Sequence, residues 1–271
     1  MEHVARRGVD FCPRVAATLS GETIARTEDG AHFVRCITYL PGNPLAEVRR
    51  PNQCALLRYN DLLTNLGRAV GALDAALADF DHPAVHREFY WDLAQAERVV
   101  GEYLPLVAPI GYRRVIERVS DVSLSFVDRH LAALRRTTVH HDANDWNVLV
   151  DGPRISGIID FGDIVHSWTV ADPAVAIAYA MLDSADPLAA AVTMVGGYHE
   201  RRPMDDAEIA CVFPFSALRL CMSACIAASQ QHQRAGDPYL GISQASIERM
   251  LPLVAEIPPA RARDRLWRAC R

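Results

Sequence analysis

Lysine is absent from this sequence, because all 28 basic residues are arginine. A chain without lysine cannot form a Schiff base through a side-chain amine, and it cannot use a lysine as a general base. It also cannot hold phosphates with the lysine of a P-loop. The absence therefore excludes several common forms of catalysis.

Long apolar runs and paired cysteine motifs are also missing. The longest apolar run, Ala174–Leu182, is far short of the roughly 20 residues that a membrane span needs. The opening MEHVARRGVDFCP lacks the apolar segment of a signal peptide. The seven cysteines are odd in number and scattered, without C-x-x-C, which favours reduced thiols over disulfides or a zinc site. We therefore expect a cytoplasmic protein with no membrane partner.

The charge balance shows no strong excess of either sign. Net charge is −5, with 50% hydrophobic and 23% charged residues, values typical of a folded soluble protein. A chain of roughly this length buries about 75% of its unfolded surface, so one large domain or two unequal lobes can form. No nucleic acid partner is expected.

The first part of the chain has the pattern of β structure. Residues 14–40 alternate or cluster β-forming residues around the turn signal Glu28-Asp29-Gly30, as in a β-hairpin. PGNPLAEV follows, a Pro/Gly break that continues neither strand nor helix. We expect residues 1–40 to form a partial N-terminal β lobe and 41–48 a hinge or linker.

The remainder, residues 49–271, is expected to form a mainly helical C-terminal lobe. Apolar residues from Leu56 to Phe80 recur with helical spacing, which predicts one long helix. Further helices are predicted over about 92–107, 120–136, 171–182, 186–199, 205–231 with a kink at Pro214, and 238–254. In the helix over 120–136, one face is expected to carry Val122, Phe126, His130 and Leu134. Residues 137–165 return to short strands, and Asp151-Gly152-Pro153 is the turn of a β-hairpin. The expected fold class is α+β.

Two motifs in the hairpin region carry chemistry. His140, Asp142 and Asn147 fit H-x-D-x-x-x-x-N, and Asp160-Phe161-Gly162 follows at the end of an apolar strand. Phosphoryl transfer needs one carboxylate beside the acceptor hydroxyl, and an amide oxygen and a second carboxylate to hold Mg²⁺. Because Asn147 and Asp160 start and finish the two strands of the hairpin, we expect them to lie close together. Either motif alone is a weak signal, and the pair is a strong one.

On these residues the sequence resembles a known family. VHHDANDWNVLV and IIDFGD are similar to the aminoglycoside phosphotransferase (APH) family of small-molecule kinases, which is related to protein kinases. DANDWNVLV, IIDFGDIVHSWTV and AVAIAYAML most resemble its hydroxylysine-kinase-type members, which also occur fused to class III aminotransferases. The resemblance covers roughly residues 14–255. It implies a two-lobe kinase-like fold in which the N-terminal β lobe is incomplete.

The resemblance also implies roles for particular residues. Asp142 would be the catalytic base, His140 would brace its loop, and Asn147 and Asp160 would bind Mg²⁺. The backbone of Thr38, Tyr39 and Leu40 would meet the adenine of ATP or the base of GTP. Asp163 and Asp145 would lie beside the metal or contact the acceptor. The partners implied are a nucleotide and a small, amine-bearing molecule that offers a hydroxyl group.

Two departures from the family pattern stand out. His141 occupies a position that is usually glycine, which adds bulk and a titratable group at a tight turn. A kinase lobe also needs a glycine-rich strand pair and a strand lysine, yet only about 40 residues precede the hinge and no lysine exists. We therefore expect that part of the lobe to be missing before Met1 or supplied by a missing or fused domain.

Three alternatives remain open at this level. A catalytically impaired kinase-like module would keep the loop and lose turnover. His140-His141 with Asp145 fits H-H-x-x-x-D of acyltransferases, although this reading leaves the IIDFGD segment unexplained. A further group of acids follows the site, and they either bind a cationic substrate or serve as helix caps and solvated charges: Asp183, Asp186, Asp205 and Asp206.

Overall fold

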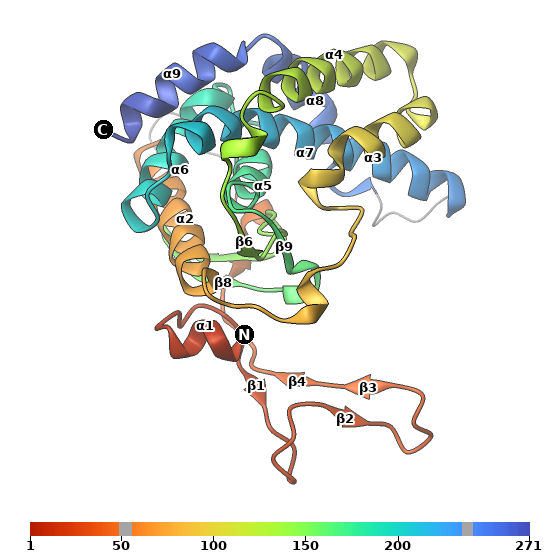
Figure 1. Ribbon diagram of the computed structural model, residues 1–271, viewed down its shortest axis with the longest axis vertical. Coiled ribbons are helices and arrows are strands. Elements are labelled where there is room, and N and C mark those ends of the chain that lie inside the picture. Colours follow the sequence, from red (N-terminus) through yellow and green to blue (C-terminus); the bar gives the residue numbers. More distant parts are fainter. Residues whose placement is uncertain (49–55, 235–240) are drawn as a thin grey trace.

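The computed structural model describes residues 1–48, 56–234 and 241–271. Small antiparallel sheets accompany a helical body (Figure 1), so the predicted α+β class is confirmed. The boundary predicted at residue 49 and the helix start predicted at residue 238 lie outside the described residues.

The N-terminal region is a short helix followed by a β-ribbon. Helix α1 (Glu2–Arg6) precedes four two-residue strands: β1 (Val15–Ala16), β2 (Ala25–Arg26), β3 (Phe33–Val34) and β4 (Cys36–Ile37). Strand β1 pairs with β4 and β2 pairs with β3, both antiparallel, and the ribbon extends away from the helical body (Figure 1). Gly30 turns the ribbon at φ +67° and donates to the Thr27 carbonyl at 2.8 Å. The predicted hairpin is confirmed.

The Pro/Gly break forms a strand, contrary to prediction. Strand β5 (Asn43–Pro44) pairs with β7 (Val148–Asp151), which also pairs with β8 (Arg154–Ile158). Because β5 is an edge strand, proline is tolerated there. Gly42 before it has φ +134°, and a Cβ there would lie 2.2 Å from Ser156 Oγ. The segment thus connects the ribbon to the predicted catalytic hairpin.

Helices form the rest of the molecule. They are α2 (Leu56–Leu77), α3 (Ala96–Tyr103), α4 (Ile110–Val127), α5 (Ala171–Ala180), α6 (Pro187–Arg201), α7 (Asp206–Gln233), α8 (Gln244–Ala255) and α9 (Pro259–Ala269). Strands β6 (Arg136–Val139) and β9 (Val165–Trp168) pair antiparallel among them. In α2 the predicted apolar face is buried, including Leu63, Leu66, Val70 and Leu73.

One predicted helix is wrong in its bounds. The helix expected over 120–136 is α4, which begins at Ile110 after Pro109 and ends at Val127. Val122, assigned to its inner face, is 48% exposed, while Ile116 and Val119 are buried. Phe126, predicted on the same face, is buried, and the β-forming residues from Arg136 onward start strand β6.

Helix α7 is the central helix of the body. In the described chain it alone is long and apolar enough to cross a membrane, and its apolar stretch is wholly buried in the molecule. A helix that is apolar on all sides is expected inside a protein core. The helix continues through Pro214, and α3, α4, α5, α8 and α9 all contact it.

Helices α2 and α6 approach each other at glycines. A Cβ on Gly67 would lie 2.0 Å from the Met194 carbonyl oxygen, and a Cβ on Gly197 would lie 2.1 Å from the Thr64 carbonyl oxygen. We expect Gly197→Ala to lower the free energy of unfolding by about 3 kcal/mol, because a methyl group must push two backbones apart. Gly101→Ala is the matched control, since nothing lies within 4 Å of its Cβ position. The control should gain about 0.5–1 kcal/mol from helix propensity, and urea unfolding measures both. Equal effects of the two variants would contradict the close packing.

Candidate active site

Two antiparallel strand pairs frame the predicted catalytic loop. The loop leaves β6 at Val139 and enters β7 at Val148. In the β7–β8 pair, Val148 lies opposite Ile158, and the Asn147 carbonyl accepts the Ile159 N–H at 2.9 Å. The hairpin therefore places Asn147 next to the residues that lead into Asp160, as its two-strand pattern predicts.

Three side chains hold the Asp142 carboxylate. Asn147 Nδ2 donates to Oδ2 at 2.6 Å, while Asn144 Nδ2 donates to Oδ1 at 3.0 Å. Arg219 on α7 donates to Oδ1 at 2.9 Å. The Asp142 side chain is 15% exposed, so this anion is fixed in direction and still reachable.

The sequence motifs did not identify Asn144 as a residue of the site. Its Oδ1 accepts the N–H groups of Trp146 at 2.8 Å and Asn147 at 3.1 Å, an Asx-type turn that tightens the loop. The signal was an asparagine three residues before Asn147. A side chain that both shapes the turn and binds Asp142 links the loop conformation to the carboxylate.

His140 has the bracing position predicted for it. Its ring is fully buried and packs edge-on against Phe161, with 4.7 Å between the ring centroids. Its Nδ1 accepts the Asp142 N–H at 3.3 Å. The histidine thereby connects the catalytic loop to the segment that carries Asp160.

His141 occupies a backbone conformation that suits glycine. Its φ is +67°, in the left-handed region, which costs an ordinary residue roughly 1–2 kcal/mol. The ring is fully buried, and Nε2 lies 3.3 Å from the Leu93 N–H and 3.4 Å from Asp92 Oδ1. The predicted tight turn is present, and the added ring is accommodated on the side of α3.

Asp160 offers an uncommitted carboxylate. Its φ is +62°, and its Oδ1 accepts the Gly162 N–H at 3.1 Å. The side chain is exposed, and it forms no ion pair within the described residues. A cavity of about 200 Å³ brings Asp160 together with Asp142 and Asn147.

The donor set suits a hard divalent cation. Asn147 commits its nitrogen to Asp142, which leaves its amide oxygen as a possible ligand beside the Asp160 carboxylate. In the part of the chain that is described, no cluster of three or more His, Cys, Asp or Glu could hold a metal. Mg²⁺ commonly keeps one or two protein ligands and completes its shell with water and phosphate oxygens. The pair therefore fits Mg²⁺ brought by a nucleotide.

The neighbouring acids differ in their surroundings. Burial raises the pKa of Asp163, and the charge of Asp142 raises it further, while Arg219 opposes the shift. Asp163 is therefore electrostatically close to the loop, although it does not line the cavity. Asp145 is buried and lines both the catalytic cavity and an adjoining cavity of about 490 Å³.

The four acids that follow the site in the sequence also differ in their surroundings. Asp186 caps α6, and Asp205 caps α7 in a capping box with Glu208. Asp206 accepts from Trp267 Nε1 at 3.1 Å. These three therefore have structural partners, whereas Asp183, paired with Arg249 at 2.7 Å, lines the adjoining cavity.

The three residues predicted to meet the nucleotide base lie apart from this cavity. The Thr38 N–H donates to the Arg14 carbonyl at 2.9 Å, and Tyr39 is 87% exposed. Leu40 reaches β8, where its Cδ1 lies 2.9 Å from the position of a Cβ on Gly157. None of them is among the residues that line the cavity with Asp142, so their role stays a prediction.

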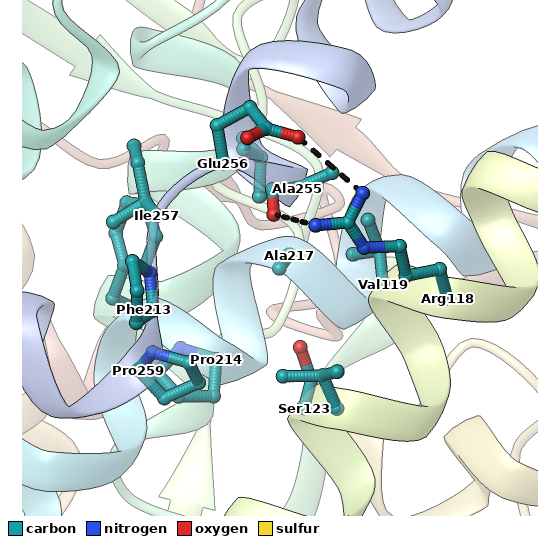
Figure 2. Close-up of a pocket in the computed structure, with 13 residues that line it drawn as sticks. Arg118, Val119, Ser123, Phe213, Pro214, Ala217, Ala255, Glu256, Ile257 and Pro259 are labelled. Carbon is teal, nitrogen blue, oxygen red and sulfur yellow. Dashed lines mark hydrogen bonds and ion pairs between the residues drawn. The ribbon is translucent and has the colours of Figure 1, made fainter.

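A third cavity contains little that is chemically active. Figure 2 shows this space of about 320 Å³ between α4, α7 and the turn joining α8 to α9. Its wall is mainly apolar, and Arg118 and Glu256 pair at 3.3 Å beside it. It shares no lining residue with the cavity at Asp142, so the reactive groups gather at the catalytic loop.

Asp172 supports the loop from the first turn of α5. Its carboxylate accepts the N–H of His140 at 3.0 Å and of His141 at 2.7 Å. Asp74 on α2 lies beside it and is also fully buried. Sequence patterns did not identify either residue, because their partners lie far away along the chain.

Burial and the charge of Asp172 both disfavour ionisation of Asp74. Burial and the charge of Asp172 raise the pKa of Asp74 well above its ordinary range, although the Tyr198 hydroxyl, which donates to Asp74 Oδ2 at 2.6 Å, lowers it. Asp74 Oδ1 has no hydrogen-bond partner within the described chain, so no donor there stabilises a charged carboxylate. Asp74 is therefore neutral where an exposed carboxyl group is charged.

This arrangement predicts a pH-dependent stability. Because the folded state keeps a proton that the unfolded chain releases above about pH 4, Asp74 stabilises the fold most at low pH. That contribution falls as pH rises, by at most about 1.4 kcal/mol per pH unit. Asp74→Asn mimics the neutral carboxyl group, so its free energy of unfolding should rise relative to that of the wild type as the pH increases from 5 to 8. Urea unfolding across this range measures the difference, and parallel curves would refute the raised pKa of Asp74.

The sequence of this chain is similar to those of known phosphotransferases. A family model described as the phosphotransferase enzyme family, APH, matches residues 1–205. Hydroxylysine kinase of Mus musculus is 31% identical over 211 residues, which cover 73% of this chain and 54% of the relative. Hydroxylysine kinase of Bos taurus is 30% identical over 231 residues, covering 80% and 59%. The chain thus spans little more than half the length of these relatives.

Solved structures share the fold at lower identity. An aminoglycoside phosphotransferase from Alicyclobacillus acidocaldarius has a TM-score of 0.65 at 16% identity, covering 99% of this chain and 80% of the other. A microcompartment-associated aminopropanol kinase has a TM-score of 0.60 at 20% identity, covering 99% and 82%. An amicoumacin kinase in complex with AMP-PNP and Ca²⁺ has a TM-score of 0.62 at 16% identity, covering 95% and 76%.

Proposed function

This chain belongs to the APH phosphotransferase enzyme family, and from that membership we propose that it moves the γ-phosphate of ATP or GTP to a hydroxyl group of a small, amine-bearing molecule. The observation that carries the proposal is the cavity that Asp142, Asn147 and Asp160 share. A base and two hard oxygen ligands on one cavity are the parts that phosphoryl transfer requires.

Each of these residues has a defined task in the proposal. Asp142 orients the acceptor hydroxyl and takes its proton, and His140 holds the loop against Phe161. Asn147 and Asp160 would hold Mg²⁺, which would neutralise charge on the phosphate oxygens. The hydrogen bonds from Asn144, Asn147 and Arg219 fix the Asp142 carboxylate, which limits the reorganisation needed when the acceptor binds.

The adjoining cavity supports an amine-bearing acceptor. Asp145 and Asp183 line it together with Trp146, and Asp145 and Trp146 also line the catalytic cavity. Carboxylates and an aromatic face attract an ammonium group. Because the curated relatives are named hydroxylysine kinase, hydroxylysine is the first acceptor to test.

A nucleotide-binding module without turnover is the second candidate. It is favoured by the complete absence of lysine and by the separation of Thr38–Leu40 from the cavity. The acyltransferase reading fits less well, because the His141 ring is buried beside Asp92 rather than presented as a base. We further propose a reducing cytoplasmic setting, which the free buried thiols of Cys12, Cys211 and Cys221 support.

A phosphotransfer assay tests the proposal. Purified chain is incubated with Mg²⁺, ATP or GTP, and hydroxylysine or simple amino alcohols, and product is followed by mass spectrometry. Transfer to an acceptor with loss of signal in EDTA is the expected result. Nucleotide-dependent thermal stabilisation without transfer would favour the binding module, and neither binding nor transfer would refute both candidates.

A further inference from the structure

An arginine lies buried in the central helix of the molecule. Arg219 stands near the middle of α7 and is 2% exposed, in a stretch of otherwise apolar or small residues. Burying a charge is costly unless it is paired and hydrogen-bonded. Helix packing alone would favour an apolar side chain here, so the arginine requires another explanation.

The guanidinium of Arg219 is held on several sides. Its Nη2 donates to Asp142 Oδ1 at 2.9 Å, and its Nη1 donates to the Trp91 carbonyl at 3.2 Å. The central carbon lies 4.6 Å from the Trp91 ring centroid and 5.8 Å from that of Tyr179. A cation placed over an aromatic face is attracted to it, most strongly when it is desolvated. These contacts hold the plane of the Arg219 guanidinium against Trp91 and direct its Nη2 atom toward Asp142.

Arg219 also stays charged in this position. Burial lowers the pKa of its guanidinium, but Tyr179, Asp142 and Asp163 raise it by more, so the net direction is upward. Asn144 and Asn147 anchor Asp142 from within the loop, whereas Arg219 is its anchor from the helical core. The carboxylate thus has a fixed positive neighbour that does not move with the loop.

The two oxygens of the Asp142 carboxylate differ in how many of their acceptor positions are filled. A carboxylate has about four lone-pair positions, and Asn144 and Arg219 fill the two on Oδ1. Asn147 fills one on Oδ2, which leaves one position there. Oδ2 is thus the oxygen of Asp142 that keeps a free acceptor position.

We propose that Arg219, clamped over Trp91, is the positioning residue for the Asp142 carboxylate and selects Oδ2 as the atom that receives the acceptor proton. This inference rests on the proposed kinase function. It assigns control of the Asp142 base to a residue of α7 that is distant in sequence from both motifs.

Replacing Arg219 should separate turnover from binding. Arg219→Met keeps length and removes charge, so we expect kcat to fall about 100-fold, because a small displacement of a reacting group costs that much. The nucleotide KM should stay within about 3-fold, since ground-state binding is untouched. This split between kcat and KM is the result expected of a positioning residue, because a merely structural loss would not confine its effect to kcat.

A matched control distinguishes positioning from stability. Arg135 is also paired with a buried carboxylate, that of Glu208, away from the cavity. Arg135→Met should lower Tm while kcat and the nucleotide KM stay unchanged. Trp91→Phe keeps an aromatic platform and should retain more activity than Trp91→Leu. If Arg219→Met does not fold, the order of the two Trp91 variants decides the proposal.

The absence of lysine provides a readout that does not need activity. In this chain Arg219→Lys creates the sole lysine, so ¹³Cε-lysine labelling gives one side-chain signal by NMR. We expect that signal to shift when Asp142→Asn is added and to remain unmoved by Arg135→Met. A lysine signal that Asp142→Asn does not shift, or full kcat in Arg219→Met, would overturn the inference. A wild type without turnover would instead refute the proposed function, and the lysine signal would still decide the contact.

Discussion

Asp142→Asn is expected to lower kcat by about 10²–10⁴-fold, the range that a positioned general base contributes. Asparagine keeps the shape of the side chain and can still bind Arg219 through its oxygen. It cannot take the acceptor proton, and its nitrogen then faces Asn147 Nδ2, which donates to Asp142 Oδ2 in the wild type. The loss should therefore fall on kcat, measured with saturating nucleotide and acceptor, while the nucleotide KM changes little.

Asp151→Asn is the control for this substitution. Asp151 lies at the far end of the same hairpin, where it pairs with Arg154 at the surface. An exposed pair of this kind contributes at most about 1 kcal/mol, so this variant should keep both its kcat and its fold. If Asp142→Asn retained wild-type kcat, Asp142 would not be the base, and the cavity would have to be explained as a binding site.

The local part of the site was predictable from the sequence. Spacing within the loop and the hairpin placed Asn147 beside the segment leading to Asp160, because strand pairing converts sequence distance into spatial distance in a regular way. The left-handed turn at His141 also followed from a position that is usually glycine. These features depend on neighbours along the chain or on one hairpin.

The anchors of the loop could not be found in that way. Arg219 lies 77 residues from Asp142 in the sequence, and Asp172 lies 31 residues from His141. Their contacts depend on how α5 and α7 pack, which periodicity does not specify. One signal was available for Arg219, namely a lone charge inside a long apolar stretch, since such a charge needs a buried partner.

The error in α4 has a related cause. Val122 and Ser123 are neighbours, yet Val122 is exposed and Ser123 is buried. Hydrophobicity alone therefore does not predict which of these two positions is buried. The neighbouring elements, not the helix itself, decide which face is covered.

Asp160→Asn is expected to remove the dependence of nucleotide binding on Mg²⁺. Asp160 is the charged member of the proposed ligand pair, and a metal supplies several kcal/mol of charge stabilisation to phosphoryl transfer. Loss of that amount lowers the rate by about 10²–10³-fold. Asparagine is the informative replacement, because it tolerates the left-handed backbone at φ +62° and can still accept the Gly162 N–H. A fall in activity would then report the lost charge and not a strained turn.

Thermal shifts with ATP, measured with and without Mg²⁺, test this expectation directly. In the wild type Mg²⁺ should add to the stabilisation by ATP, because binding to the folded state raises stability by mass action. In Asp160→Asn the two curves should nearly coincide. Asp121→Asn, an exposed carboxylate on α4, should behave as the wild type. An undiminished Mg²⁺ effect in Asp160→Asn would place the metal elsewhere. Loss of the Mg²⁺ effect would mean that, in this lysine-free chain, the cation held by Asp160 balances the charge of the phosphates.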